Sequence, residues 1–281
     1  MSKYYCVNGK IVLAKNAKLQ VTDLGLVRGY GIFDFLKVEQ GIPLFIEDHM
    51  NRFLNSAREM NLNLKHSVEE LKKMVMKLIA KNEFKNGGMK IILTGGYSED
   101  GYFPSKETNL IIMLSKIKKP SKKNYDQGIK LLLHKHFRDI ASVKTTNYIV
   151  PIRLANELKK QGATDVLYHW DGKISESSRS NFFIVKKDNT IVTPKTHILN
   201  GITRKRVVEI AQQHYKLIEK DISVRELKNA KEAFLSSTTK GTLPVTQVDD
   251  IKIGNGKAGK VSTHLNELLK KQAKEYRKDF K

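Results

Sequence analysis

Apolar positions in the first part of the chain alternate between strand-like and helix-like spacing. Apolar residues with helical periodicity predict amphipathic helices over residues 46–60 and 68–80. Short apolar or alternating runs predict strands around them, at residues 10–14, 33–39, 89–94 and 110–115. This mixture indicates a first α+β unit.

The second part of the chain follows a polar, lysine-rich stretch at residues 118–128, which is typical of a linker. We therefore expect a small N-terminal domain (1–117), the linker (118–128) and a larger C-terminal domain (129–281). The expected strands of the larger domain are 129–134, 165–170, 181–185, 190–193 and 232–236. Its expected helices are 151–160, 203–214, 224–229 and the amphipathic tail 261–276.

The composition excludes several classes of protein. Its 281 residues are 40% hydrophobic, without an apolar run near the length of a membrane span. The single cysteine, Cys6, excludes an intrachain disulfide and a cysteine-cluster metal site. No metal ligand is among the expected site residues. The first residues lack the apolar core of a secretory signal. A cytoplasmic protein without a membrane partner is expected.

The net charge of +22 raises the question of nucleic-acid binding. The lysines, however, are scattered along the chain, and no zinc-ligand spacing or aromatic RNA-recognition motif accompanies them. This distribution favours a solvated basic surface over a specific nucleic-acid site. A basic nucleic-acid-binding module remains an alternative from another class, and steeply salt-dependent binding without a cofactor would identify it.

Four short motifs carry the candidate chemistry. They are Val-Lys-Thr-Thr-Asn-Tyr at 143–148, Ser-Glu-Ser-Ser-Arg-Ser-Asn-Phe at 175–182, Leu-Asn-Gly-Ile-Thr-Arg at 199–204 and Ser-Ser-Thr-Thr at 236–239. They supply an amine that can form an imine and a carboxylate that can pair with a pyridine nitrogen. They also supply two turns whose backbone and hydroxyl groups can hold a phosphate. These are the requirements of a pyridoxal phosphate site.

The order and spacing of these motifs resemble the class IV (fold-type IV) aminotransferases, which include branched-chain and D-amino acid aminotransferases and aminodeoxychorismate lyase. The resemblance covers essentially the whole chain and begins with the segments 23–34 and 47–52. It implies an α+β fold with a small α/β domain and a larger pseudo-barrel α/β domain. It also implies pyridoxal 5'-phosphate as cofactor and a homodimer.

The resemblance also implies roles for individual residues. Lys144 forms the Schiff base and moves a proton during transamination, and Glu176 pairs with the pyridinium nitrogen. Asn181 and Phe182 match structural supports of this motif. The remaining cofactor contacts implied are Arg52, Gly201, Ile202, Thr203 and Thr238 at the phosphate, Leu199 at the ring face and Tyr148 at the ring hydroxyl.

The residues that select the substrate depart from the better-known members. Phe33 stands where familiar D-amino acid aminotransferases have tyrosine, and their Arg-x-His carboxylate trap is missing from residues 94–98. The branched-chain signature Phe-Glu-Gly-x-Arg is also missing, at residues 33–37. We hypothesise that Arg28, contributed by a neighbouring subunit, and Arg179 bind the substrate carboxylate instead. Phe33 and Thr239 complete the expected substrate site.

Small and acidic substrates suit such a pocket. The leading interpretation is transamination between a D-amino acid (D-alanine or D-glutamate) and a 2-oxo acid such as 2-oxoglutarate. A branched-chain L-amino acid aminotransferase is the first alternative, and aminodeoxychorismate lyase is the second.

Overall fold

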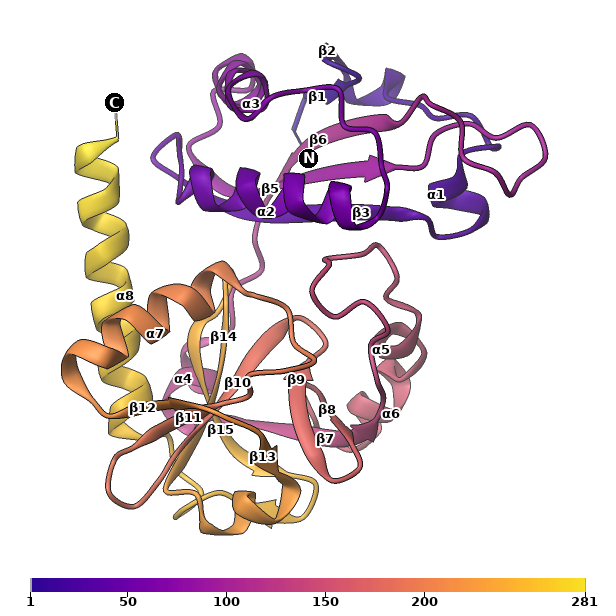
Figure 1. The fold of residues 1–281 in the computed structure, drawn as a ribbon. Helices are drawn as coiled ribbons and strands as arrows, with labels where there is room; N and C mark the ends of the chain where they lie inside the picture. The colour runs from indigo at the N-terminus through magenta and orange to yellow at the C-terminus, as the bar shows by residue number, and fades with distance from the viewer. Residues whose placement is uncertain (1, 281) are drawn as a thin grey trace. The chain divides into compact units, whose positions relative to one another are not determined.

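The chain folds into two units, each built on its own β-sheet (Figure 1). The computed structural model describes residues 2–280. The first unit contains the chain up to Ile117, the segment Val143–Asn147 and the C-terminal residues from Tyr276. The second contains Lys118–Ser142 and Tyr148–Glu275. This division differs from the expected one because the segment carrying Lys144 belongs to the first unit, and the expected linker belongs to the second.

The first unit has a six-stranded antiparallel sheet. Strand β3 shows why the alternating pattern forms a strand, since its residues alternate between buried and half-buried positions along its length. In sheet order the strands are β2 (Lys10–Leu13), β1 (Tyr4–Val7), β6 (Asn109–Ser115), β5 (Asn86–Thr94), β3 (Gly31–Glu39) and β4 (Ile42–Pro43).

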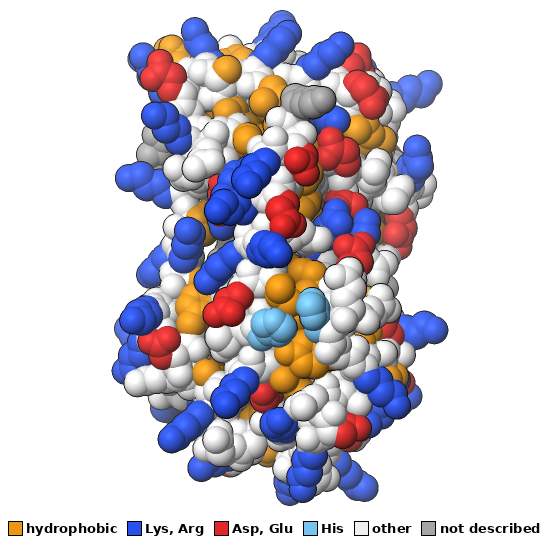
Figure 2. All heavy atoms as spheres, turned by 90° about the vertical axis from the view of Figure 1, so that its left-hand side faces the viewer, with side chains coloured by type: hydrophobic (Ala, Val, Ile, Leu, Met, Phe, Trp, Pro, Cys, Tyr) orange, Lys and Arg blue, Asp and Glu red, His pale blue; other side chains and the backbone are white. Residues whose placement is uncertain are grey.

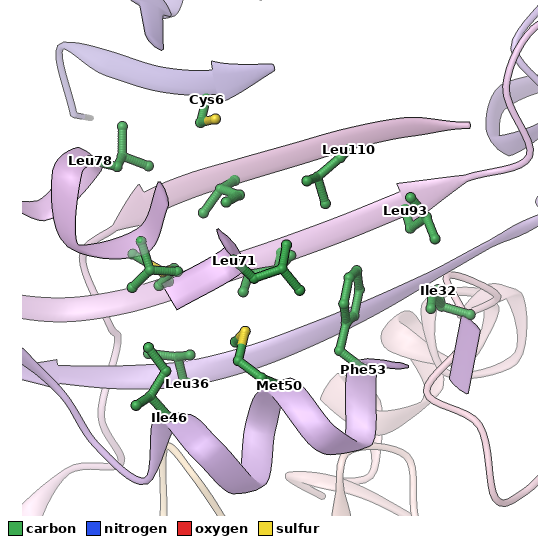
Figure 3. Packing of buried hydrophobic residues seen from close by; sticks show 14 of the residues in the cluster. Cys6, Ile32, Leu36, Ile46, Met50, Phe53, Leu71, Leu78, Leu93 and Leu110 are labelled. Atoms are coloured by element: carbon green, nitrogen blue, oxygen red, sulfur yellow. The ribbon is translucent and has the colours of Figure 1, made fainter. Parts of the chain in front are cut away.

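Two long helices supply the helical part of the core of the first unit (Figure 3). Met50 and Phe53 of α2 (Ile46–Glu59) and Leu71 and Leu78 of α3 (Val68–Lys81) are completely buried. Ser67 begins α3 through a capping box with Glu70. The unit also contains η1 (Ala14–Asn16) and α1 (Leu24–Val27).

The second unit contains a ten-stranded sheet that closes on itself. Strand β9 pairs with both β8 and β10, so β10, β14, β15, β7, β8 and β9 form a ring. The sheet therefore has the barrel-like architecture expected from the sequence. The ring strands are β7 (Ile129–Lys135), β8 (Asp165–Trp170), β9 (Lys173–Ser177), β10 (Ser180–Val185), β14 (Glu232–Ser237) and β15 (Gly241–Val248). The outer strands are β11 (Ile191–Thr193), β12 (Leu217–Glu219), β13 (Ile222–Ser223) and β16 (Ile251–Lys252).

The helices of the second unit differ from the expected ones in three places. The expected linker contains α4 (Lys122–Gln127), which begins with a capping box at Ser121. The expected helix 151–160 is instead two short helices, α5 (Ile149–Arg153) and α6 (Ala155–Lys160). Residues 224–229 form a 3-10 helix, η2 (Val224–Asn229). The long helices are α7 (Ile202–His214) and α8 (Lys260–Asp279), of which the residues from Tyr276 on belong to the first unit. No helix within residues 2–280 is long and apolar enough to cross a membrane.

Candidate active site

The segment that carries Lys144 extends the sheet of the first unit beside β3. The Phe33 amide donates to the Lys144 carbonyl at 2.8 Å, and the Thr146 amide donates to the Gly31 carbonyl at 2.9 Å. Val143, just before the lysine, is completely buried in the core. The Lys144 Nζ lies 4.7 Å from the centroid of the Phe33 ring. The structure thus brings together the expected Schiff-base lysine and one expected substrate residue.

Arg52 is held by a buried carboxylate. Its Nε and one terminal nitrogen donate to the two oxygens of Asp34, both at 2.8 Å, and the Arg52 side chain is only 11% exposed. The His49 ring nitrogen Nδ1 lies 2.7 Å from the same carboxylate. In the sequence of α2, Arg52 lies opposite the buried apolar positions of the helix, but its bonds to Asp34 of β3 keep it from being a solvated surface arginine.

The charges around Asp34 control its protonation. Burial alone would raise the pKa of this carboxyl, but the Arg52 guanidinium and His49 outweigh that effect and hold the pKa well below its usual range. For His49, burial lowers the pKa of the imidazole despite the opposing effect of Asp34. The result is an ionised Asp34 that fixes the orientation of the Arg52 guanidinium.

Arg28 follows α1 and is exposed. One of its terminal nitrogens donates to the Val27 carbonyl at 3.1 Å. Within the described part of the chain it forms no ion pair with a carboxylate. The guanidinium is therefore not engaged by a structural acid of this unit.

Glu176 lies in the second unit, where strand register places it beside Asn181. Glu176 of β9 pairs with Asn181 of β10, and Asn181 pairs with Ser236 of β14. The Asn181 amide donates to Glu176 Oε2 at 3.2 Å and to the Leu199 carbonyl at 2.8 Å, while the Leu199 amide donates to Glu176 Oε2 at 3.0 Å. Glu176 and Asn181 are both buried. These bonds fix the carboxylate in a single orientation.

Arg138 is a site residue that sequence analysis missed. Its guanidinium forms an ion pair with Glu176 Oε1 at 2.5 Å and also donates to the Ala141 carbonyl at 3.3 Å. The arginine provides a positive charge beside a carboxylate that is only 5% exposed. Arg138 follows a histidine-rich strand end without a recognisable motif, and only the fold shows that it reaches a residue 38 positions later.

Apart from Arg52 of α2, the residues expected at the phosphate lie at the start of α7 and in the turn directly after β14. Gly201 is the N-cap of α7 and has no side chain to cap the helix, so the first amides of Ile202 and Thr203 are available as donors. A Cβ at Gly201 would lie 2.1 Å from Asn181 Oδ1. The glycine is required by this close approach, because its φ of −66° is ordinary for any residue.

Three buried serine hydroxyls in the second unit have no hydrogen-bond partner among the described residues, namely Ser177, Ser236 and Ser237. Two of them immediately precede Thr238, the second expected phosphate contact. Buried hydroxyls normally have partners. The hydroxyls without partners, the uncapped helix start and the oriented Glu176 fit a cofactor with an anionic group and a pyridine nitrogen.

The remaining expected residues surround this network. Burial raises the pKa of the Tyr148 phenol, and the Glu176 and Asp165 charges act in the same direction, against Arg138 and Arg179. Arg179 occupies the two-residue turn between β9 and β10, is exposed, and forms no ion pair within residues 2–280. Leu199 is 9% exposed, and Thr239 lies in the turn between β14 and β15.

The second unit is barrel-like and contains a glutamate that is paired with an arginine and lies beside an uncapped helix start. The first unit contains a lysine whose amine lies over the Phe33 ring. Together these features indicate the class of pyridoxal phosphate enzymes. Residues 31–248 match the family model for amino-transferase class IV, and the chain therefore belongs to the class IV aminotransferase family. Its cofactor is pyridoxal 5'-phosphate, and it is an enzyme.

Relatives in sequence agree with this assignment. The chain is 31% identical to D-alanine aminotransferase from Staphylococcus haemolyticus over 96% of its own length and 98% of that protein. It is 31% identical to the Staphylococcus aureus (strain N315) protein of the same name, over 94% of this chain and 96% of that one.

Among solved structures, branched-chain amino acid aminotransferase from Escherichia coli has a TM-score of 0.90 at 24% identity, covering 96% of this chain and 94% of that chain. The lyase for 4-amino-4-deoxychorismate from Pseudomonas aeruginosa has a TM-score of 0.82 at 24% identity, covering 95% and 98%. At these identities the two structures show the fold alone, which is fold-type IV.

Proposed function

We propose that the protein is a D-amino acid transaminase that exchanges the amino group of D-alanine or D-glutamate with a 2-oxo acid such as 2-oxoglutarate. The similarity to D-alanine aminotransferases over nearly the whole of both chains carries this proposal. The structural neighbours named as branched-chain enzymes are less similar in sequence, at 21–24% identity. Amino acids and oxo acids are the substrates of the family.

Each catalytic residue has a role that its surroundings support. When bound, pyridoxal phosphate supplies a carbonyl group for the amine and a ring that takes up electrons from Cα. The Lys144 amine holds the cofactor and then moves the proton between the substrate Cα and the C4′ position. Glu176, oriented by Asn181 and Arg138, keeps a proton on the ring nitrogen.

The other cofactor residues hold the two ends of the molecule. Arg52 provides a cation for the phosphate, in an orientation fixed by Asp34. Backbone amides at the start of α7 and the hydroxyls near Thr238 provide neutral donors. Leu199 packs on the ring, and Tyr148 donates to the ring hydroxyl.

Two arginines are proposed to bind the substrate carboxylate. Arg179, and Arg28 from a second copy of the chain, replace the missing Arg-x-His trap. Neither forms an ion pair with a carboxylate of the described chain, so both guanidinium groups remain available to an anion. Substrate contacts are also proposed for Phe33 of the first unit and for Thr239 of the second.

A homodimer in the cytoplasm completes the proposal. Val21 and Leu26, on either side of the start of α1, are 76% and 69% exposed. An apolar surface next to Arg28 suits burial against a second copy. On the face drawn in Figure 2, lysine and arginine side chains are interspersed with acidic and uncharged ones, which favours a solvated basic surface over a specific nucleic-acid site there.

The decisive experiment is the absorption spectrum of the purified protein with bound cofactor, recorded before and after adding D-alanine or, separately, L-leucine. Conversion to the pyridoxamine form by D-alanine alone supports the proposal. Conversion by L-leucine alone would replace it with the branched-chain activity. Release of pyruvate from aminodeoxychorismate without an oxo acid would replace it with the lyase. Lys144→Ala is the control, in which neither amino acid produces conversion.

A further inference from the structure

Lys240 is a nearly buried lysine to which the site described above assigns no role. It lies in the turn between β14 and β15, directly after Thr239, and its side chain is 10% exposed. Its Nζ donates to Ser180 Oγ at 2.8 Å and lies 3.6 Å from Asp165 Oδ2. Burying a charged amine is unfavourable without partners, so this position requires an explanation.

Asp165 connects Lys240 to Ser178, a residue of the β9–β10 turn. The Ser178 hydroxyl donates to Asp165 Oδ1 at 2.5 Å, and Asp165 is buried at 2% exposure. Its other oxygen, Oδ2, accepts no hydrogen bond from the described residues and has only the ion-pair contact with Lys240. The Lys240–Asp165 pair therefore holds Ser178 through the carboxylate and Ser180 through the amine.

These two serines flank Arg179, the arginine proposed to bind the substrate. Because β10 and β14 are antiparallel neighbours with Asn181 opposite Ser236, the turn carrying Arg179 lies beside the turn carrying Lys240. The two positive charges interact: burial lowers the pKa of the Lys240 ammonium and the Arg179 charge lowers it further, while Asp165 opposes both. Repulsion from Lys240 favours an Arg179 side chain that extends away from the buried pair.

We propose that Lys240 and Asp165 form a clamp that fixes the β9–β10 turn and so positions Arg179 for an anionic group of the substrate. Lys240 is a positioning residue in this proposal, because it acts through Ser180 and Asp165 on the turn. The proposal rests on the proposed function, in which Arg179 contacts the substrate carboxylate. Without the clamp, the two-residue turn would keep its strand pairing but lose the side-chain contacts that hold its flanks.

The test is a double-mutant cycle on the holoenzyme with D-alanine or D-glutamate as amino donor and 2-oxoglutarate as acceptor. Lys240→Met is expected to raise KM for the amino acids about 10- to 100-fold, the range for misplaced orienting groups, with a smaller change in kcat. Arg179→Met is expected to raise the same KM. The double variant should be no worse than Arg179→Met alone, since the clamp acts only through that arginine.

Two further variants separate positioning from folding. Lys240→Arg keeps the charge and the donors and should restore most of the substrate affinity. Ser180→Ala removes only the hydroxyl that accepts from Lys240, so it tests the clamp even where Lys240→Met fails to fold. A several-fold increase in KM is expected for it. Lys220→Met is the matched control, because Lys220 pairs with Glu226 in the same unit and is 43% exposed.

The outcomes distinguish the clamp from the function on which it rests. Additive effects of the Lys240 and Arg179 substitutions would mean direct contact of Lys240 with substrate and would overturn the clamp. An unchanged KM in both Lys240→Met and Ser180→Ala would also overturn it, while leaving the transaminase assignment intact. An unchanged KM in Arg179→Met, with cofactor conversion by D-alanine preserved, would overturn the carboxylate role of Arg179 and the clamp with it. Absence of conversion by D-alanine in the parent enzyme would overturn the function itself.

Discussion

Replacing Gly201 with alanine tests whether the contact between α7 and Asn181 organises the cofactor site. The backbone permits alanine, because φ at this position is −66°. The added Cβ would lie 2.1 Å from Asn181 Oδ1, whereas Cβ atoms in real structures essentially never approach closer than 3.0 Å. The Asn181 amide must therefore move by nearly 1 Å.

That movement disrupts two hydrogen bonds. The Asn181 amide donates to Glu176 Oε2 at 3.2 Å and to the Leu199 carbonyl at 2.8 Å. A bond to a charged acceptor contributes about 1.5–3 kcal/mol and a neutral one about 0.5–1.5 kcal/mol. We therefore expect Gly201→Ala to lower the free energy of unfolding by about 2–4.5 kcal/mol. Urea unfolding of the apoprotein measures this loss, and a cofactor titration measures the loss of affinity as Glu176 becomes less well oriented.

A double-mutant cycle of Gly201→Ala and Asn181→Ala tests whether the loss of stability arises from the clash with Asn181. Asn181→Ala removes both hydrogen bonds and the atom that clashes, so adding Gly201→Ala to it should change stability by no more than about 0.5 kcal/mol. If the two substitutions are additive, or if Gly201→Ala alone is neutral, then helix α7 adjusts its position and the Asn181 contact does not fix the site.

Three further predictions follow from contacts described above. Arg138→Leu leaves the buried Glu176 without its paired cation and should lower kcat at least about 10-fold at saturating cofactor. Arg138→Lys should recover part of this loss. Equal kcat values for the parent enzyme and both variants would show that Arg138 has no role in the site. Because burial lowers the pKa of His49 in the folded state, the contribution of this residue to the free energy of unfolding is fully present above its unfolded pKa of about 6.5. As the pH drops below that value, the free energy of unfolding falls by up to about 1.4 kcal/mol per pH unit. Urea unfolding at several pH values should show a shallower fall for His49→Gln, and an unchanged slope would show that other groups dominate. Leu71→Ala, at a fully buried position, should cost about 2–5 kcal/mol of stability in urea unfolding. The control Met76→Ala, on an exposed position of α3, should cost no more than about 0.5 kcal/mol.

The sequence allowed accurate prediction of the elements that have a regular apolar period and of the properties that depend on ordered motifs. The strand 33–39 and the helices 46–60 and 68–80 match β3, α2 and α3 within two residues, because each buries one regular face. The class IV family, the fold type and the cofactor were likewise correctly predicted from the ordered motifs. The individual site roles and the substrate stay predictions.

The missed features depend on contacts between distant residues. Arg138 and Lys240 are ordinary basic residues in sequence, and only tertiary contacts with Glu176 and Asp165 reveal buried partners. Very short strands such as β4 and β13 have too few residues for a period to appear. The helix predicted at 151–160 breaks at Leu154, which separates α5 from α6, and periodicity does not mark such a junction.

The pairing of residues 143–147 with β3 limits how enzymes of this architecture can be recombined. The Lys144 amine lies over Phe33, yet the two residues are separated in sequence by most of the first unit and by the start of the second. A chimera joined at residue 117 would take Lys144 from one parent protein and Phe33 from the other. Exchange of substrate-selecting elements between relatives should therefore move residues 143–147 together with the first unit, so that Lys144 and its neighbouring strand β3 come from the same parent protein.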